Sequence, residues 1–146
     1  MFAELTSQAR SHEQAESHDS PCVLIVEDDP LTQARLELLL EATGLAAVSV
    51  PSAHQARAAL GAVFFPIVIV DRMLEDGDGI SLCQEVRRQH AQSRVYLMLL
   101  SALDSAADVA EGMAAGADEY LSKRASDTDL IACLEAARRI IALPPK

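Results

Sequence analysis

Several polar residues stand where short apolar runs of the sequence end. In chain order they are Glu27, Asp28 and Asp29 after one run, Asp71 after a second, Ser101 after a third and Lys123 after a fourth. Carboxylates that lie close together raise one another's pKa or require a cation. Mg²⁺ is the hard divalent ion that suits such oxygen ligands. A carboxylate between that ion and a lysine can attack phosphorus, because both cations neutralise the transferring phosphoryl group.

The apolar runs are typical of strands buried on both faces of a sheet. Strands are predicted over 22–26, 46–50, 66–70, 95–100 and 119–121. Helices are predicted to begin at the Asp29-Pro30 pair, at Ser52, after the Gly77 and Gly79 turn, at Ser105 and at Ser126. Five strands alternating with five helices predict an α/β fold, a doubly wound (βα)5 flavodoxin-like sandwich with parallel sheet order 2-1-3-4-5.

Helical spacing also predicts which side chains face the core. The first helix has a stripe at Leu31, Ala34, Leu38 and Ala42, and the fourth has one at Ala106, Val109, Ala110 and Met113. Met98 is likewise interpreted as core, and Gly77 and Gly79 as turn glycines. Asp29 before Pro30 is interpreted as a helix cap.

In this topology the first and third strands are neighbours, and ligands bind at the carboxyl ends of the strands. Glu27, Asp28 and Asp71 should therefore meet at one edge of the sheet. Ser101 and Lys123, on the far side of Asp71, would hold an anion that reaches the metal across Asp71.

Composition narrows the classes of partner. The 146 residues hold 12 Lys and Arg against 22 Asp and Glu, a net charge of −10, which argues against a nucleic-acid partner. No apolar run is long enough for a membrane span, and the N-terminus lacks the pattern of a secretory signal, so a cytoplasmic protein is expected.

The three cysteines are interpreted as reduced, buried thiols, and the four histidines as inert. The domain is predicted over 21–142, between a polar extension (1–20) and a tail or cut linker (143–146).

Four segments, VLIVEDDP, IVIVDRMLEDGDG, LMLLSA and GADEYLSK, resemble the motifs of bacterial two-component response-regulator receiver domains, in order and at the right spacing. The resemblance covers about residues 21–142. It implies a phosphoacceptor signalling domain in which a histidine kinase or histidine phosphotransfer protein phosphorylates Asp71. It implies no enzyme activity beyond the domain's own phosphorylation and dephosphorylation.

The resemblance also implies residue roles. Asp28 would bind Mg²⁺ (or Mn²⁺) directly, Glu27 through water, and Asp71 and the Met73 carbonyl would complete the protein contacts. Ser101 and Lys123 would bind the phosphoryl group. Tyr120 would be a rotating switch on the face of the fourth helix, fifth strand and fifth helix, although an ordinary aromatic at the core's edge stays an open alternative.

Two positions depart from the family pattern. Arg124 follows Lys123 where a proline, often with a cis bond, is usual, and Glu75 also replaces a common proline. A trans bond before Arg124 is expected, because a cis bond there would cost roughly 3–4 kcal/mol.

Other functions fit the sequence less well. A flavin carrier is disfavoured because the acids would repel the flavin phosphate, and an aspartyl phosphatase because Met73 replaces its second Asp. A receiver-like interaction module that no longer uses phosphorylation remains the alternative.

The sequence does not identify an output domain or downstream partner. It leaves open whether the chain is a stand-alone regulator or a fragment of a longer protein such as a diguanylate cyclase. Met73 and Leu103 are expected to slow loss of the phosphoryl group.

Overall fold

Five parallel strands form the central sheet of the computed structural model, which describes residues 22–91 and 94–142. The strands are β1 (Cys22–Val26), β2 (Ala46–Val50), β3 (Ile67–Asp71), β6 (Tyr96–Ser101) and β7 (Glu119–Ser122). Their order, β2-β1-β3-β6-β7, is the predicted one, because the two labels between β3 and β6 belong to a separate hairpin. The predicted extension and tail lie outside the described residues.

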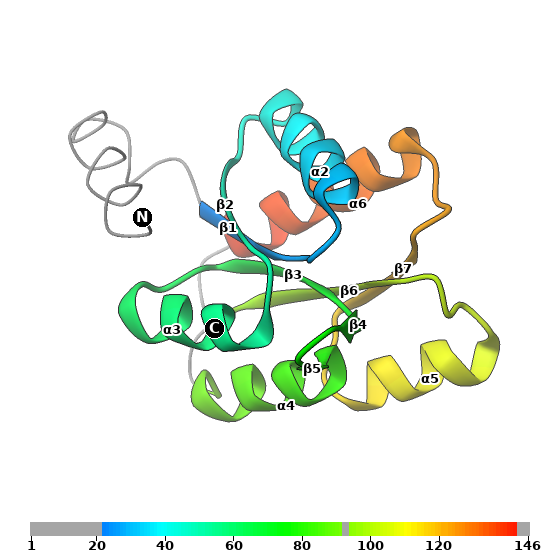
Figure 1. Ribbon diagram of the computed structural model, residues 1–146. Coiled ribbons are helices and arrows are strands. Elements are labelled where there is room, and N and C mark those ends of the chain that lie inside the picture. Colours follow the sequence, from blue (N-terminus) through cyan, green and yellow to red (C-terminus); the bar gives the residue numbers. More distant parts are fainter. Residues whose placement is uncertain (1–21, 92–93, 143–146) are drawn as a thin grey trace.

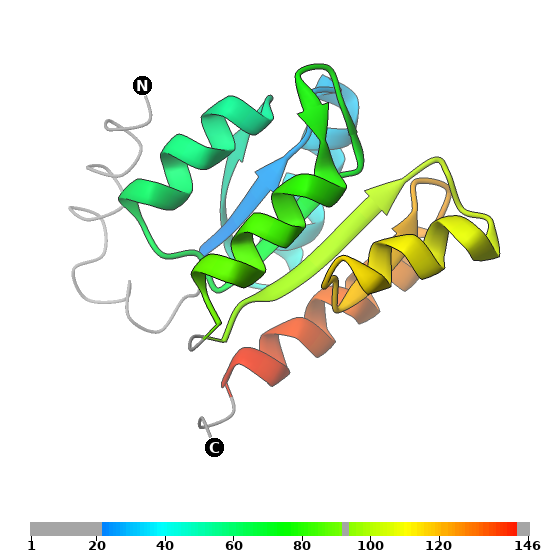
Figure 2. The same cartoon turned by 90° about the horizontal axis from the view of Figure 1, so that it is seen from below.

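Helices cover both faces of the sheet (Figure 1). They are α2 (Pro30–Ala42), α3 (Ala53–Ala62), α4 (Gly79–Gln89), α5 (Ala106–Ala114) and α6 (Asp127–Ala142). Helices α2 and α6 lie on one face, and α3, α4 and α5 lie on the other (Figure 2). Every residue of β3 and β6 is buried, which is why these strands read as continuous apolar runs.

The helix starts follow the predicted caps. The Asp29 carboxylate accepts a hydrogen bond from the Thr32 N–H, and Ser52 accepts one from the Gln55 N–H. Ser105 and Asp108 form a reciprocal capping box at the start of α5. The interpretation of Asp29 as a structural cap is confirmed.

A short hairpin after β3 was not predicted. Strands β4 (Met73–Leu74) and β5 (Gly77–Asp78) pair antiparallel and lead directly into α4. The Asp76 carboxylate at its turn accepts hydrogen bonds from the Ala53 N–H at 2.9 Å and the His54 N–H at 3.0 Å. The hairpin is therefore fixed to the N-terminus of α3.

The predicted core stripe of α2 is wrong. Leu31 is 81% exposed and Leu38 65% exposed, whereas α2 buries Leu36, Leu39 and Leu40. Leucines occur around most of this helix, so helical spacing alone could not choose the buried face.

The predicted stripe of α5 is also wrong. The only residue that α5 buries is Gly112, and Met113 is 43% exposed. The ring of Tyr120 lies against Gly112, so this aromatic side chain occupies space between helix and sheet that the predicted stripe of alanine, valine and methionine was expected to fill. The other Met prediction is confirmed, since Met98 is 1% exposed.

The three cysteines are free thiols, but only Cys83 is buried. Burial raises the pKa of Cys83 to about 12 and that of Cys22 to about 11. Cys22 and Cys133 are half-buried, so the prediction of three buried thiols holds for Cys83 alone.

The part of the chain that the structure describes has no helix long and apolar enough to cross a bilayer.

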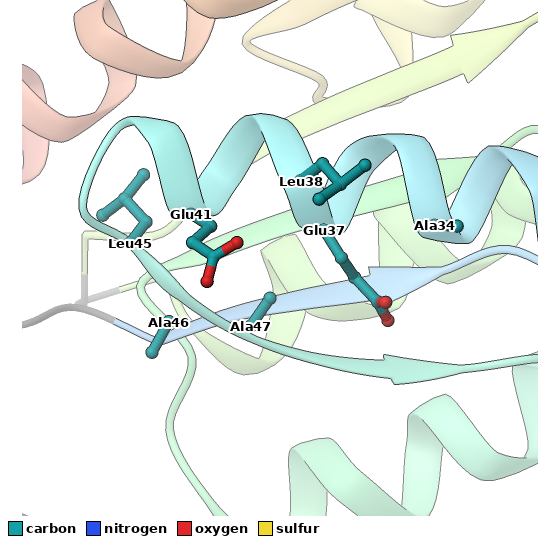
Figure 3. Close-up of a pocket in the computed structure, with 7 residues that line it drawn as sticks. All are labelled: Ala34, Glu37, Leu38, Glu41, Leu45, Ala46 and Ala47. Atoms are coloured by element: carbon teal, nitrogen blue, oxygen red, sulfur yellow. The ribbon is translucent and has the colours of Figure 1, made fainter.

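A groove of about 710 Å³ lies between α2 and the N-terminal half of β2 (Figure 3). Its lining is apolar apart from Glu37 and Glu41. The predicted site lies at the carboxyl ends of the strands, so this groove is not part of it.

Candidate metal and anion site

Among the described residues, Glu27, Asp28 and Asp71 form the predicted acid cluster, with one oxygen from each lying within 4.8 Å of the others. Glu27 directly follows β1, and Asp71 ends the neighbouring strand β3. Glu27 is 1% exposed and Asp71 3% exposed, whereas Asp28 is partly exposed. Parallel pairing of the two strands therefore brings the carboxylates together.

Lys123 provides the positive charge of the site. Its Nζ lies 3.1 Å from Asp71 Oδ2 and 3.1 Å from Glu27 Oε1. Burial by itself would lower the pKa of Lys123, but its hydrogen bonds to Glu27 and Asp71 outweigh burial and raise the pKa. One ammonium thus faces three carboxylates, which leaves the cluster with an excess of negative charge.

The chemistry of Glu27 suits a cation. Its pKa is raised to about 7, first because burial removes water from the carboxylate and also because Asp71 repels it. Glu27 Oε2 accepts hydrogen bonds from the Asp29 N–H and from Lys123. No described residue donates a hydrogen bond to the buried Oε1, although Lys123 Nζ is nearby. An oxygen in this position, beside two further carboxylates, fits a hard divalent ion.

The backbone after Asp71 is held beside its carboxylate. The Met73 N–H donates to Asp71 Oδ1 at 3.0 Å, while Oδ2 faces Lys123. A cavity of about 470 Å³ opens here, and its lining includes Asp28, Met73 and Leu103. The two apolar side chains predicted to affect hydrolysis therefore border one cavity with a candidate metal ligand.

Ser101 is the last residue of β6 and is fully buried. Its Oγ accepts a hydrogen bond from the Leu103 N–H at 2.9 Å, and its carbonyl accepts one from the Lys123 N–H at 2.9 Å. These bonds hold the two predicted anion-binding residues on adjacent strand ends.

Tyr120 lies in β7 with its hydroxyl in a polar network. The hydroxyl donates to the Leu103 carbonyl at 2.5 Å and accepts from Arg72 Nη1 at 3.2 Å. A Cβ added at Gly112 would come within 2.5 Å of the Tyr120 ring. The ring therefore packs directly on the backbone of α5.

Sequence reasoning missed two residues at this site. Arg72 is only 8% exposed and contacts Tyr120 and α5. The sequence feature that could have indicated it is a charged residue directly after a buried strand. Gly79 is more than a turn residue, because an added Cβ would lie 2.5 Å from the Asp71 carbonyl oxygen. The turn interpretation suffices for Gly77, where the nearest contact would be an ordinary 3.6 Å.

The loop after Lys123 takes a form that a proline could not reproduce. The described residues contain no cis peptide bond, as expected before Arg124. The Arg124 N–H donates to Ser122 Oγ at 3.0 Å, and Arg124 Nη2 donates to Asp104 Oδ2 at 2.6 Å. Ser122 Oγ also donates to Asp104, at 2.9 Å. The loops that follow β6 and β7 are thereby tied together.

Comparison with known families agrees with this arrangement. Residues 23–135 match the response regulator receiver domain. The chain belongs to this receiver domain family. It is a phosphoacceptor signalling domain of the two-component type.

Curated relatives of this receiver domain are longer proteins. The transcriptional regulatory protein PmrA of Pectobacterium parmentieri is 38% identical over 117 residues, which are 80% of this chain and 52% of that protein. The transcriptional regulatory protein CseB of Streptomyces coelicolor is 35% identical over 121 residues, 83% of this chain and 50% of that protein. The chain thus spans about half the length of the curated relatives it matches.

Solved structures give the same fold. The receiver domain of Francisella response regulator 1452 is 27% identical with a TM-score of 0.76, covering 83% of this chain and 98% of that one. The BeF3-activated receiver domain of Klebsiella pneumoniae RstA is 27% identical with a TM-score of 0.73, covering 81% and 98%. The predicted flavodoxin-like fold and family resemblance are therefore confirmed.

Proposed function

We propose that this receiver domain accepts a phosphoryl group on Asp71 from a histidine kinase or a histidine phosphotransfer protein. The observation that carries the proposal is the position of Asp71 between Lys123, 3.1 Å away, and the two acids of the cluster. A carboxylate oxygen of Asp71 would form a bond to phosphorus while the bond from phosphorus to the donor's histidine nitrogen breaks. The histidine nitrogen leaves with the electron pair of that bond.

Glu27, Asp28, Asp71 and the Met73 carbonyl are the groups that would hold a divalent ion, Mg²⁺ or in its place Mn²⁺. The buried Glu27 Oε1, which accepts no hydrogen bond from a described residue, and the all-oxygen donor set support this assignment. When bound, the ion supplies positive charge to the transferring phosphoryl oxygens.

The other site residues would bind the transferred group. Lys123 already pairs with Asp71 and would turn its ammonium to a phosphoryl oxygen. Ser101 Oγ accepts a hydrogen bond from Leu103, so its own hydrogen can be donated to the phosphoryl group. Tyr120, linked to the same Leu103 through its carbonyl, would then reorient on the α5–β7–α6 face.

The wider setting is also proposed. The segments matched in the relatives named above make up only about half of those transcriptional regulators, which supports a role for the domain as the receiver of a cytoplasmic response regulator with an output domain or downstream protein. The domain itself would catalyse only its own phosphorylation and dephosphorylation, without direct contact to nucleic acid.

Intact-mass spectrometry after incubation with acetyl phosphate tests the acceptor chemistry. We expect one phosphoryl adduct that requires Mg²⁺, is absent from Asp71→Asn and persists in Asp129→Asn, an exposed acid on α6. The chain has no tryptophan, so the mass adduct replaces a fluorescence assay. An adduct retained in Asp71→Asn would refute the assignment. Absence of an adduct with both acetyl phosphate and a phosphohistidine donor would favour an interaction module that does not use phosphorylation.

A further inference from the structure

The backbone of Lys123 is held through the residues on both sides of it. Its own N–H donates to the Ser101 carbonyl at 2.9 Å. On one side Ser122 Oγ donates to Asp104 Oδ2 at 2.9 Å, and on the other Arg124 Nη2 donates to the same oxygen at 2.6 Å. One carboxylate therefore binds the residue before Lys123 and the residue after it.

The backbone of Arg124 completes this arrangement. Its N–H donates to Ser122 Oγ at 3.0 Å, so the serine hydroxyl accepts from Arg124 while it donates to Asp104. A proline has no N–H and could not form this bond. The hydrogen bonds from Ser122 and Arg124 hold the pKa of Asp104 below its ordinary value, so the carboxylate is charged at neutral pH. We call these three mutually bonded residues, Asp104, Ser122 and Arg124, the clasp.

The loop that carries Asp104 is itself fixed. Leu103, the residue before it, donates its N–H to Ser101 Oγ at 2.9 Å. Ser105, the residue after it, is the N-cap of α5 and part of the capping box there. The clasp thus joins the backbone of Lys123 to a loop that is anchored on both sides of Asp104.

The position of this backbone affects where the ammonium group of Lys123 lies. Nζ is 3.1 Å from Asp71 Oδ2 and 3.1 Å from Glu27 Oε1. Lysine has a long, flexible side chain, so anchoring its backbone removes conformations in which the ammonium would lie away from these acids. The Arg124 side chain is 76% exposed, so the clasp lies on the solvent side of the site. It can be removed without changing any of the three acids or Lys123.

We propose that Asp104 and Arg124 are positioning residues, which hold the ammonium group of Lys123 beside Asp71 through the clasp. This part concerns the free domain and stands by itself. Its consequence, a faster transfer of the phosphoryl group to Asp71, rests on the proposed function.

Competitive acetylation with trace acetic anhydride tests the position of Lys123 in the free full chain, without Mg²⁺ or a phosphoryl donor. Lys123 and Lys146 are the two lysines of the sequence, so the labelling of one can be expressed relative to the other. Arg124→Ala and Asp104→Ala should each raise the ratio of Lys123 to Lys146 labelling about threefold or more, because an ammonium released from its carboxylates gives up its proton more readily. Mass spectrometry of the digested chain measures the ratio.

Arg139→Ala is the matched control. It removes an exposed arginine of α6 and changes the net charge by the same amount as Arg124→Ala, so the labelling ratio should stay at its wild-type value. Asp104→Asn keeps an oxygen that can accept from Ser122 and should raise the ratio less than Asp104→Ala. An unchanged ratio in both alanine variants of the clasp, or an equal rise in the control, would overturn the proposal. Either alanine variant suffices if the other fails to fold.

The rate of adduct formation from acetyl phosphate and Mg²⁺ tests the consequence for phosphoryl transfer. Arg124→Ala should slow it about threefold or more, because a displaced ammonium neutralises the transferring group less well. Arg139→Ala should leave the rate unchanged. In a Lys123→Ala background Arg124→Ala should slow the reaction no further, because the clasp acts through Lys123. Equal slowing in both backgrounds would indicate a general structural role and would overturn the proposal.

The two measurements separate the clasp from the acceptor chemistry. A raised labelling ratio without an adduct from acetyl phosphate or a phosphohistidine donor would support the clasp and defeat the proposed function. An adduct that forms equally fast in the wild type and in both clasp variants would support the proposed function and overturn the role of Asp104 and Arg124 in transfer.

Discussion

Helices α4 and α5 lie on the same face of the sheet and border the same site, but they are attached in different ways (Figure 2). Helix α4 buries Ile80, Leu82, Cys83 and Val86, and its first residue, Gly79, lies against the backbone of Asp71. Helix α5 buries Gly112 alone and is held through Arg72. Apolar burial holds α4, whereas α5 is held by the polar contacts of Arg72 and by the packing of Gly112 on the Tyr120 ring.

The amino-acid sequences of α4 and α5 explain why the two helices are attached differently. The segment GISLCQEVRRQ has large apolar side chains at helical spacing, and each of them removes substantial area from water. The segment AADVAEGMA is rich in alanine, which has little side chain to bury. The two sides of the site therefore differ in how much apolar side-chain area they bury.

Truncation of one apolar side chain in each helix should give the largest contrast. Leu82→Ala should lower the free energy of unfolding by about 2–5 kcal/mol, because Leu82 is 1% exposed and its loss leaves a cavity. Met113→Ala should lower it by less than about 1 kcal/mol, because this side chain on α5 is 43% exposed. Urea denaturation measures both. Comparable losses would show that α5 is packed as tightly as α4.

Gly79→Ala should have the next largest effect. Its Cβ would meet the Asp71 carbonyl oxygen at 2.5 Å and the Arg72 Cα at 2.8 Å, both of them backbone atoms. We expect a loss of about 1–3 kcal/mol and slower phosphorylation, since the acceptor strand must shift. The control Gly77→Ala meets only the Ala53 Cβ at 3.6 Å and should be close to wild type. Equal effects of the two changes would show that the close approach of Gly79 to the Asp71 backbone is not required.

The central strands β1, β3 and β6 were predictable because burial on both faces leaves a continuous apolar run. Predicted and observed strand ends agree within one residue, and four of the five helices begin at the predicted caps. The exception is α4, which is capped by Asp78 and begins at Gly79. The helix faces were less predictable. In α2 leucines surround the helix, and in α5 the space against the sheet is occupied by Tyr120 from a strand further along the chain.

The acid cluster and Lys123 followed from the rule that parallel strands end at one edge. Arg72 did not, because its partners depend on where α5 lies and not on spacing within its own segment. A charged residue directly after a buried strand, with Asp108 and Glu111 three residues apart on a later helix, is the pattern that would have indicated it.

Gly112→Ala examines the contact between α5 and Tyr120, with Gly61→Ala as control. A helical Gly→Ala change normally stabilises by up to about 1 kcal/mol, and at Gly61 nothing lies within 4 Å of the added Cβ. At Gly112 the new Cβ would come within 2.5 Å of the Tyr120 ring, so the gain should disappear as the ring moves outward. Acrylamide quenching of tyrosine fluorescence in a Tyr96→Phe background should then increase, because Tyr120 is the remaining tyrosine. Unchanged quenching would mean that α5 moves instead of the ring.

The smallest contrast concerns the loops that lead into the two helices. Asp76 fixes the hairpin before α4 through two backbone N–H groups, whereas Asp104 fixes the loop before α5 through Ser122 and the exposed side chain of Arg124. Asp76→Asn should therefore lower the thermal midpoint more than Asp104→Asn, and both should lower it less than Leu82→Ala. The hydrogen bonds from Ala53 and His54 hold the pKa of Asp76 below its ordinary value.

The pH dependence of Asp76→Asn separates a charge effect from a general loss of packing. A carboxyl group with a lowered pKa in the folded state stabilises the fold above its unfolded pKa, and that stabilisation is lost as the pH falls through the folded pKa. The difference in midpoint between wild type and Asp76→Asn should thus be full at neutral pH and shrink below about pH 4. A difference that stays constant under acid would mean that the Asp76 charge does not hold the hairpin, and the rigidity on the α4 side would then rest on Gly79 and the apolar core alone.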